Sequence, residues 1–174
     1  LGHRDLAFLC PKRPEMNDPR LEGYRNALNA SGIPYRESLV LFTGSGYAGG
    51  KRGVMHLEEE NIPYTALITI APLQARGALE VLNAKGIRVP GDVSLITFSH
   101  DELHTIPPVT WVNTQADQLG EIAVKKLFER IRNPRLPLEY IRIPLKLEIR
   151  GSTGPLVPRH TRKWGQGKGH STRL

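Results

Sequence analysis

The sequence predicts an α/β protein built on a doubly wound parallel sheet. The first indication is residues 93–98, an almost wholly apolar run of strand length that follows the turn Pro90-Gly91-Asp92. A run without alternation indicates a strand with both faces covered, as in a parallel sheet wrapped by helices. The second indication is the regular alternation of strand-like and helix-like segments, which is typical of doubly wound sheets.

The expected strands are short segments dominated by apolar residues, with helical patterns between them. In order, they cover residues 5–10, 39–42, 65–70, 93–98 and 109–112. Two further extended pieces are expected after the last helix, at residues 140–143 and 146–149. The predicted order is therefore β-α-β-α-β-α-β, followed by β-α-β-β.

Two of the expected helices begin with recognisable signals. The first opens with Asp18 as N-cap and Pro19 at the first helical position, and Gly32 ends it. The third begins at Pro72 and stops at Gly86. Both have an apolar stripe to bury, made of Leu21, Tyr24, Ala27 and Leu28 in the first and of Ala75, Ala78, Leu79 and Leu82 in the third.

The other two helices have weaker boundaries. The second is expected from about residue 48 to residue 60, after a glycine-rich loop at residues 44–50. The fourth is expected to begin at Thr114, with Asp117 three residues on as in a capping box, and to end before Pro134. Its apolar stripe consists of Leu119, Ile122, Ala123, Leu127 and Ile131. This helix lies beyond the natural end of the first sheet, which indicates part of a larger fold.

The basic charge is concentrated near the end of the chain. The 174 residues carry a formal charge of +7, and residues 155–174 hold +5 of it without a single acid. The remainder carries only +2, so the folded body does not have the charge of a DNA-binding surface. Residues 155–174 are also rich in Gly, Pro, Ser and Thr, and we expect them to form a solvated, disordered tail.

The composition indicates one cytoplasmic domain without a membrane span. A chain of 174 residues suffices for a domain with a real core. Its longest apolar runs are of strand length, far short of the ~20 residues that a membrane helix needs. No secretory signal precedes the first expected strand, and the single Cys10 fits a reducing compartment.

The densest polar cluster follows the strand at residues 93–98. It consists of Ser99, His100, Asp101, Glu102 and His104, with Leu103 among them. Parallel sheets bind ligands beyond the carboxyl ends of their strands, so this cluster is a candidate site. His100 and His104 have the i, i+4 spacing of a zinc pair, but no third ligand is evident. A loop of solvated polar residues is the favoured interpretation, and no metal is expected.

A glycine motif lies between the second strand and the second helix. Residues 44–49 match G-x-G-x-x-G, the dinucleotide fingerprint, which requires an acid at the end of the next strand. That strand ends at residues 69–72 without an acid, so we favour a flexible crevice loop in which Tyr47 stacks on a ligand. No cofactor is expected, and neither Cys10 nor Ser99 has the partners of a catalytic nucleophile.

Five phrases occur in order with familiar spacing. They are LGHRDLAFL at residues 1–9, RLEGYRNAL at 20–28, GAL at 77–79, GIRVPGDVSLI at 86–96 and RGST at 150–153. Together they resemble the effector-binding domain of the lac repressor and purine repressor family of bacterial transcription regulators. The resemblance covers about residues 1–154.

This resemblance implies the type I periplasmic-binding-protein fold, in which two α/β lobes close on a small molecule. Residues 1–105 and 137–154 would form most of the C-terminal lobe, and residues 106–136 would belong to the N-terminal lobe. Residues 1–154 are then a partial effector-binding domain followed by the basic tail at residues 155–174. The helix-turn-helix, the hinge and most of the N-terminal lobe are absent from this sequence.

The resemblance also implies ligand contacts. The family's effector-binding arginine falls on Arg20, in a first helical turn where a cation costs ~0.3–1 kcal/mol. Ser99 falls where the family usually has an effector-binding Asp, so that Asp101 or His100 would have to replace it. Residues 71–72 are Ala-Pro where the family commonly has Asn-Asp. The effector is therefore either unlike the family's common sugars or no longer bound.

The favoured function is a non-enzymatic effector-sensing and dimerisation domain of a transcriptional regulator. The implied partners are a sugar, sugar derivative or nucleobase, a second copy of the chain, and operator DNA through the absent N-terminal domain only. Dimer contacts are expected from the helix at residues 73–85 and from the loop after Phe98. Two alternatives remain open: a solute-binding protein of a sugar transporter, and a nucleotide-dependent α/β enzyme using the loop at residues 44–49.

Overall fold

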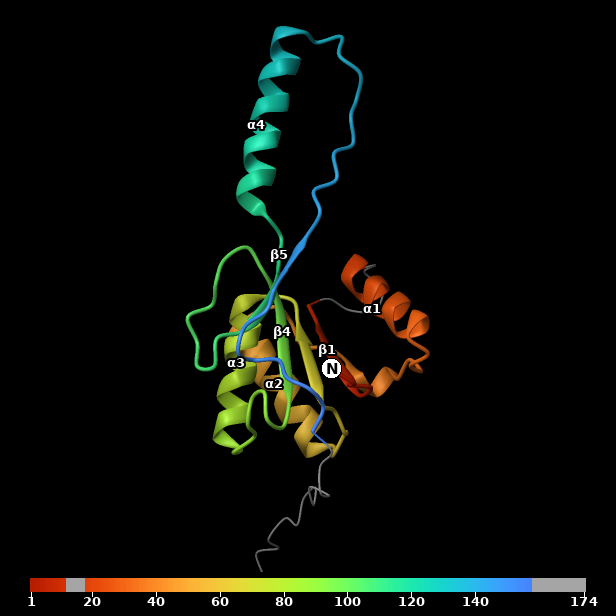
Figure 1. Ribbon diagram of the computed structural model, residues 1–174, viewed down its shortest axis with the longest axis vertical. Coiled ribbons are helices and arrows are strands. Elements are labelled where there is room, and N and C mark those ends of the chain that lie inside the picture. The colour runs from red at the N-terminus through yellow and green to blue at the C-terminus, as the bar shows by residue number, and fades with distance from the viewer. Residues whose placement is uncertain (12–17, 158–174) are drawn as a thin grey trace, which may run out of the picture.

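A six-stranded sheet with the order β2-β1-β3-β4-β5-β6 forms the centre of the computed structural model, which describes residues 1–11 and 18–157 (Figure 1). The strands are β1 (Leu6–Cys10), β2 (Val40–Phe42), β3 (Ala66–Thr69), β4 (Ser94–Ser99), β5 (Thr110–Asn113) and β6 (Lys146–Glu148). Every pairing from β2 to β5 is parallel, and only β6 runs antiparallel to its neighbour. The predicted α/β class with a mainly parallel sheet is therefore confirmed.

Helices cover both faces of this sheet (Figure 1). They are α1 (Pro19–Ala30), α2 (Tyr47–Glu59), α3 (Pro72–Ala84) and α4 (Ala116–Arg132), with a short 3₁₀ helix η1 (Glu37–Leu39) before β2. The stripe of α1 packs on one face with Phe8 and Val40, whereas α2 and α3 pack on the other with Leu9 and Leu67. The two cores arise because side chains alternate between the faces along each strand.

Strand register explains which polar residues meet at one edge. Leu9 is opposite Thr69, Thr69 is opposite Thr97, and Thr97 is opposite Trp111, so these four side chains point to the same face. The strands are parallel, and their carboxyl ends therefore lie along one edge of the sheet. The residues that leave β3 and β4 emerge there, next to the beginning of α3.

The fourth helix does not begin as the sequence predicted. Its N-cap is Gln115, which has a φ of 50° and makes no side-chain capping bond, so a capping box at Thr114 and Asp117 is wrong. The Thr114 N–H donates instead to the Ser99 carbonyl at 2.9 Å and continues the strand pairing. The side chain of Asn113 accepts from Gln115 N at 2.8 Å and makes the turn.

The region after α4 also departs from the prediction. No strand forms at residues 140–143, where Tyr140 is 96% exposed, and a single strand, β6, replaces the two extended pieces expected. Helix α4 projects away from the sheet, and the returning chain runs beside it (Figure 1). Lys126 joins the two by a salt bridge to Glu139 at 2.9 Å, and it also pairs with Glu129 of its own helix at 3.0 Å.

After β6, a buried serine holds the returning chain to the sheet. Ser152 is fully buried, donates to the Leu95 carbonyl at 2.6 Å and accepts from Thr110 N at 2.8 Å. His3 lies nearby with Nε2 3.0 Å from the Gly154 carbonyl. Residues 150–154 are therefore part of the sheet body. The tail predicted from residue 155 lies, from residue 158 on, outside the described residues.

Within residues 1–11 and 18–157, no helix has the length and apolar character needed to cross a membrane.

Candidate functional site

Arg20 lies at the second position of α1 and reaches the carboxyl edge of the sheet. Its Nη1 points to the carbonyl of Ile70, the residue that follows β3, at 3.5 Å. Its other side-chain nitrogens contact Asp18, the N-cap of α1, with Nε 3.0 Å from Oδ1 and Nη2 2.9 Å from Oδ2. The structure thus places Arg20 at the end of a central strand, where the sequence predicted a ligand contact.

Asp18 offsets the electrostatic cost that is expected for the Arg20 guanidinium in the first turn of α1. Its Oδ1 also accepts from the Arg20 backbone N–H at 2.9 Å, which caps the helix as predicted. A carboxylate at a helix N-terminus is favoured by the macrodipole and offsets the unfavourable position of the guanidinium. Arg20 is therefore stable in the first turn without any ligand.

Ser99 is buried and already engaged in its own turn. Its hydroxyl donates to the Asp101 carbonyl at 2.6 Å and accepts from Asp101 N at 3.1 Å. The Asp101 carboxylate accepts from Glu102 N at 2.7 Å, and both His100 and Asp101 are exposed. The loop of solvated polar residues that the sequence indicated is therefore a closed turn with an inward serine.

This turn lines a hollow of about 260 Å³ against the start of α3. The lining residues are Pro72, Leu73, Arg76, Ser99, His100, Asp101, Glu102, Leu103 and His104. Arg20 is not among them, because α1 and α3 lie on opposite faces of the sheet. The structure thus brings Ser99, His100 and Asp101 together but separates their hollow from Arg20.

Tyr47 is the first residue of α2, so the expected flexible loop ends before it. It is 41% exposed and lines a second hollow of about 370 Å³ along the outer face of α3, with Arg76 and Ile106. The Lys51 ammonium lies 5.7 Å from the centre of its ring. Tyr47 therefore faces the α3 surface, and its stacking on a ligand stays a prediction.

Glycines outside the motif at residues 44–49 allow close packing of α2 on α3. A Cβ atom on Gly50 would lie 1.9 Å from the Gln74 carbonyl oxygen, and one on Gly77 would lie 2.0 Å from the Tyr47 carbonyl oxygen. The backbones of α2 and α3 are therefore in direct contact, and only glycine fits between them. The expected crevice loop at residues 44–50 is wrong for its second half, which is helical.

Gln74 is a buried polar residue that the sequence analysis did not identify. It is fully buried in α3, accepts from Ile70 N at 2.9 Å and donates to the Gly44 carbonyl at 2.7 Å. It therefore fixes the ends of β3 and of the loop after β2 relative to each other. A glutamine on an otherwise apolar helical face was the available signal.

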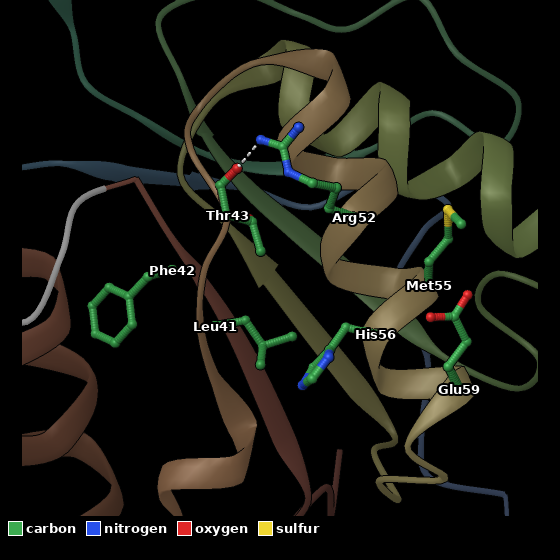
Figure 2. A pocket seen from close by; sticks show the side chains of 7 residues that line it. All are labelled: Leu41, Phe42, Thr43, Arg52, Met55, His56 and Glu59. Atoms are coloured by element: carbon green, nitrogen blue, oxygen red, sulfur yellow. Dashed lines mark hydrogen bonds between the residues drawn. The ribbon is translucent and has the colours of Figure 1, made fainter.

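A third hollow lies beside the edge strand β2 (Figure 2). It has a volume of about 440 Å³ and is lined by Leu41, Phe42, Thr43, Arg52, Met55, His56 and Glu59. Figure 2 shows Arg52 reaching back to the Thr43 carbonyl, a bond of 2.6 Å. The lining mixes apolar side chains with both signs of charge and does not define a ligand class.

A further cluster joins the turn after β4 to the β5–β6 pair. The Arg150 guanidinium lies 4.6 Å from the ring centre of Trp111, and Arg150 Nε donates to Glu102 Oε1 at 3.2 Å. Trp111 is 4% exposed, and its indole N–H has no hydrogen-bond partner among the residues described. Glu102 belongs to the polar cluster named from the sequence, but its link to Trp111 and Arg150 was not predicted, because the three residues are far apart along the chain.

In the described part of the chain, no three His, Cys, Asp or Glu side chains gather as a metal site would require. His100 and His104 both line the hollow at α3, without a third such ligand.

A doubly wound parallel sheet is typical of α/β domains that bind ligands beyond the carboxyl ends of their strands. The description "Periplasmic binding protein-like domain" belongs to a family model that matches residues 1–153. The chain is a member of this family, and its homologues are LacI-family transcriptional regulators. The resemblance noted in the sequence is thereby confirmed, together with the periplasmic-binding-protein-like fold.

Similar proteins of known identity are bacterial regulators. The HTH-type transcriptional regulator DegA of Bacillus subtilis is 30% identical over 159 residues, which is 90% of this chain and 47% of DegA. A transcriptional regulator CelR–cellobiose complex is 31% identical with a TM-score of 0.78, covering 87% of this chain and 47% of CelR. A LacI family regulator from Enterococcus faecium with bound ribose is 28% identical with a TM-score of 0.77, covering 90% of this chain and 59% of that regulator.

The chain spans about half the length of the curated relatives it matches. The part it covers is their effector-binding domain. These relatives are transcription regulators, not enzymes.

Proposed function

We propose that this chain senses a small polar effector as part of a bacterial transcriptional regulator. The observation that carries the proposal is the position of Arg20, whose guanidinium is held at the carboxyl end of β3 in a domain of this family. CelR binds cellobiose and the Enterococcus faecium regulator binds ribose, so a sugar or a related polar molecule is the proposed effector class. Action on transcription would place the protein in the bacterial cytoplasm.

The proposed mechanism uses two lobes. Residues 1–105 and 137–154 would form one lobe, and α4 with its flanking residues would belong to a second lobe that meets the first across the carboxyl edge. Helix α4 supports this division, because none of its residues is buried against the sheet. A ligand that contacts both lobes stabilises the closed arrangement by its difference in affinity for the two states.

A second copy of the chain is the proposed partner at the outer face of α3. Leu73 is 55% exposed and Ile106 is 91% exposed beside the two hollows that follow this helix. Apolar side chains of this size at one surface favour a protein partner. Operator DNA would be bound only by a helix-turn-helix region outside residues 1–174.

Thermal unfolding of the full-length gene product tests effector binding. Sugars, sugar phosphates and nucleobases are added one at a time, and one class is expected to raise Tm. A ligand at a hundred times its Kd stabilises by about 2.7 kcal/mol, which corresponds to roughly 5–10 °C for a domain of this size. Arg20→Met should remove the shift, and the Tm of the ligand-free variant is measured beside it because the buried Asp18 carboxylate loses its contact with the guanidinium. If none of the three classes raises Tm, the proposal is wrong.

The transporter and enzyme alternatives have less support. The similar proteins named above are regulators of transcription. The glycine motif on which the enzyme alternative depended lacks the acid that a dinucleotide site requires at the end of the next strand, residues 69–72.

A further inference from the structure

Asp18 forms a bidentate salt bridge with the Arg20 side chain. The bonds from Nε to Oδ1 at 3.0 Å and from Nη2 to Oδ2 at 2.9 Å have the parallel geometry of strong arginine–carboxylate pairs. The Asp18 side chain is 3% exposed and that of Arg20 is 37% exposed. One edge of the guanidinium is therefore occupied by a buried carboxylate before any ligand arrives.

This contact exceeds what helix capping requires. Capping uses one side-chain oxygen, and Asp18 Oδ1 supplies it to the Arg20 backbone N–H. Asn and Ser cap helices about as well as Asp. The second oxygen and the negative charge of Asp18 act on the Arg20 side chain, which indicates a role beyond the cap.

The rest of the guanidinium keeps donor capacity at the carboxyl edge. Among the described residues, Nη1 meets only the Ile70 carbonyl, at 3.5 Å, which is the limit of a hydrogen bond. A hydroxyl or carbonyl oxygen can accept from Nη1 while the Asp18 contact stays intact. A carboxylate or phosphate there would meet the Asp18 charge just behind the guanidinium, where burial leaves the repulsion poorly screened.

We propose that Asp18 is a positioning residue that fixes Arg20 and selects uncharged, hydroxyl-bearing effectors over their anionic derivatives. The inference rests on the proposed function, since it takes Arg20 as an effector contact. Asp18 acts through Arg20 and touches no ligand itself. The site therefore accepts a sugar and rejects the phosphate ester of the same sugar.

Inorganic phosphate is the probe that tests Asp18 independently of the natural effector. Asp18→Asn removes the negative charge and keeps a side-chain oxygen for the cap. In the full-length protein, this variant is expected to bind phosphate at least tenfold more tightly than the wild type, by isothermal titration calorimetry in low-salt buffer. Adding Arg20→Met to Asp18→Asn should abolish the gain.

Unchanged phosphate affinity in a folded Asp18→Asn protein overturns the proposal, and so does an equal gain when Arg20 is also replaced. Circular dichroism shows whether the variant folds, and Asp18→Ser takes its place if it does not. The two proposals fail separately. A phosphate gain, with no effect of sugars, sugar phosphates or nucleobases on the wild type, supports Asp18 and contradicts effector sensing, whereas sugar binding without the phosphate gain does the reverse.

Discussion

At the scale of single residues, Tyr24 shows how burial changes chemistry. It lies on the buried side of α1 and is 7% exposed, its hydroxyl donates to the Leu6 carbonyl at 2.8 Å, and its ring lies 5.2 Å from that of Phe8. Burial raises the pKa of Tyr24 to about 12, with a further rise from Tyr35 and an opposing effect of Arg36. The phenol therefore stays neutral in the folded protein at a pH where an unfolded chain would ionise it.

The free energy of unfolding should consequently fall at alkaline pH, over the range in which Tyr24 ionises. A tyrosine in the unfolded chain ionises near pH 10, so the contribution of Tyr24 is complete below pH 10 and is lost between about pH 10 and pH 12. The loss should reach about 2 kcal/mol by pH 12. Urea unfolding measured across this range should show a shallower decline in Tyr24→Phe. The exposed Tyr140 provides the control, and an equal change in Tyr140→Phe would contradict the assignment.

Single residues also show which contacts can be predicted from the sequence and which cannot. Asp18 was predicted as an N-cap, and the structure confirms it, because capping depends on local spacing. The bidentate salt bridge between Asp18 and Arg20 was not predicted, since it depends on a side-chain conformation. The Gln74–Gly44 bond and the Trp111–Arg150 contact join residues that are distant in sequence, and a single sequence does not show which residues will be partners.

At the scale of elements, the close approach of α2 and α3 depends on glycine. Gly50 and Gly77 sit where the backbone of one helix touches the other, and an added Cβ at either site would meet a carbonyl oxygen at about 2 Å. The nucleotide-binding pattern in the sequence, residues 44–49, ends one residue before Gly50, and its Gly49 is in contact with the Gly44 carbonyl of the same loop. The pattern was ambiguous because glycine permits close backbone approach both to a phosphate and to neighbouring protein backbone.

Gly50→Ala should therefore destabilise the protein, although alanine is the better helix former. Overpacking costs typically 1–3 kcal/mol, and here backbone must move, so a net loss of about 2 kcal/mol is expected after the helical preference for alanine is counted. Gly23→Ala is the matched control, because Gly23 lies inside α1 with nothing within 4 Å of the added atom. That variant should gain up to about 1 kcal/mol. Chemical denaturation measures the free energy of unfolding of both variants. An unchanged free energy of unfolding for Gly50→Ala would show that α2 and α3 can separate freely.

Element boundaries were predictable where the signal was local. Strands were placed within one or two residues, and the start of α1 at Pro19 was correct. The start of α4 was not, because Asn113 makes the turn and the Thr114 backbone pairs with β4. The piece expected at residues 140–143 lacks a neighbouring strand to pair with in this structure.

At the scale of the whole molecule, the parallel sheet followed directly from the sequence. Uninterrupted apolar strands and alternating helices allow few other arrangements. The family was recognisable from short phrases, and the match over residues 1–153 agrees with it. The relation between Arg20 and the turn at Ser99 was not predictable. They lie on different faces, and only strand order and register determine that.

Self-association should depend on the face of α3. Leu73→Asp or Ile106→Asp is expected to weaken a dimer of the full-length protein at least tenfold, about 1.4 kcal/mol, because a charge replaces an exposed apolar contact. Sedimentation equilibrium measures the effect. Met55→Asp is the control, because Met55 is an exposed apolar residue of α2 (41%) that lines the hollow beside β2. Dimers that withstand both substitutions would place the interface elsewhere.

The antiparallel pairing of β5 with β6 makes the α4 segment an excisable module. Asn113 and Lys146 are direct partners in this ladder, so both ends of the intervening segment emerge at adjacent points. Replacing residues 114–145 by a two-residue Asn-Gly turn would close the pair as a hairpin. The shortened chain should keep a single cooperative melting transition, since α4 contributes no buried residue, and a broad, non-cooperative melt would contradict this. The body could then serve as a miniature scaffold on which other insertions are grafted.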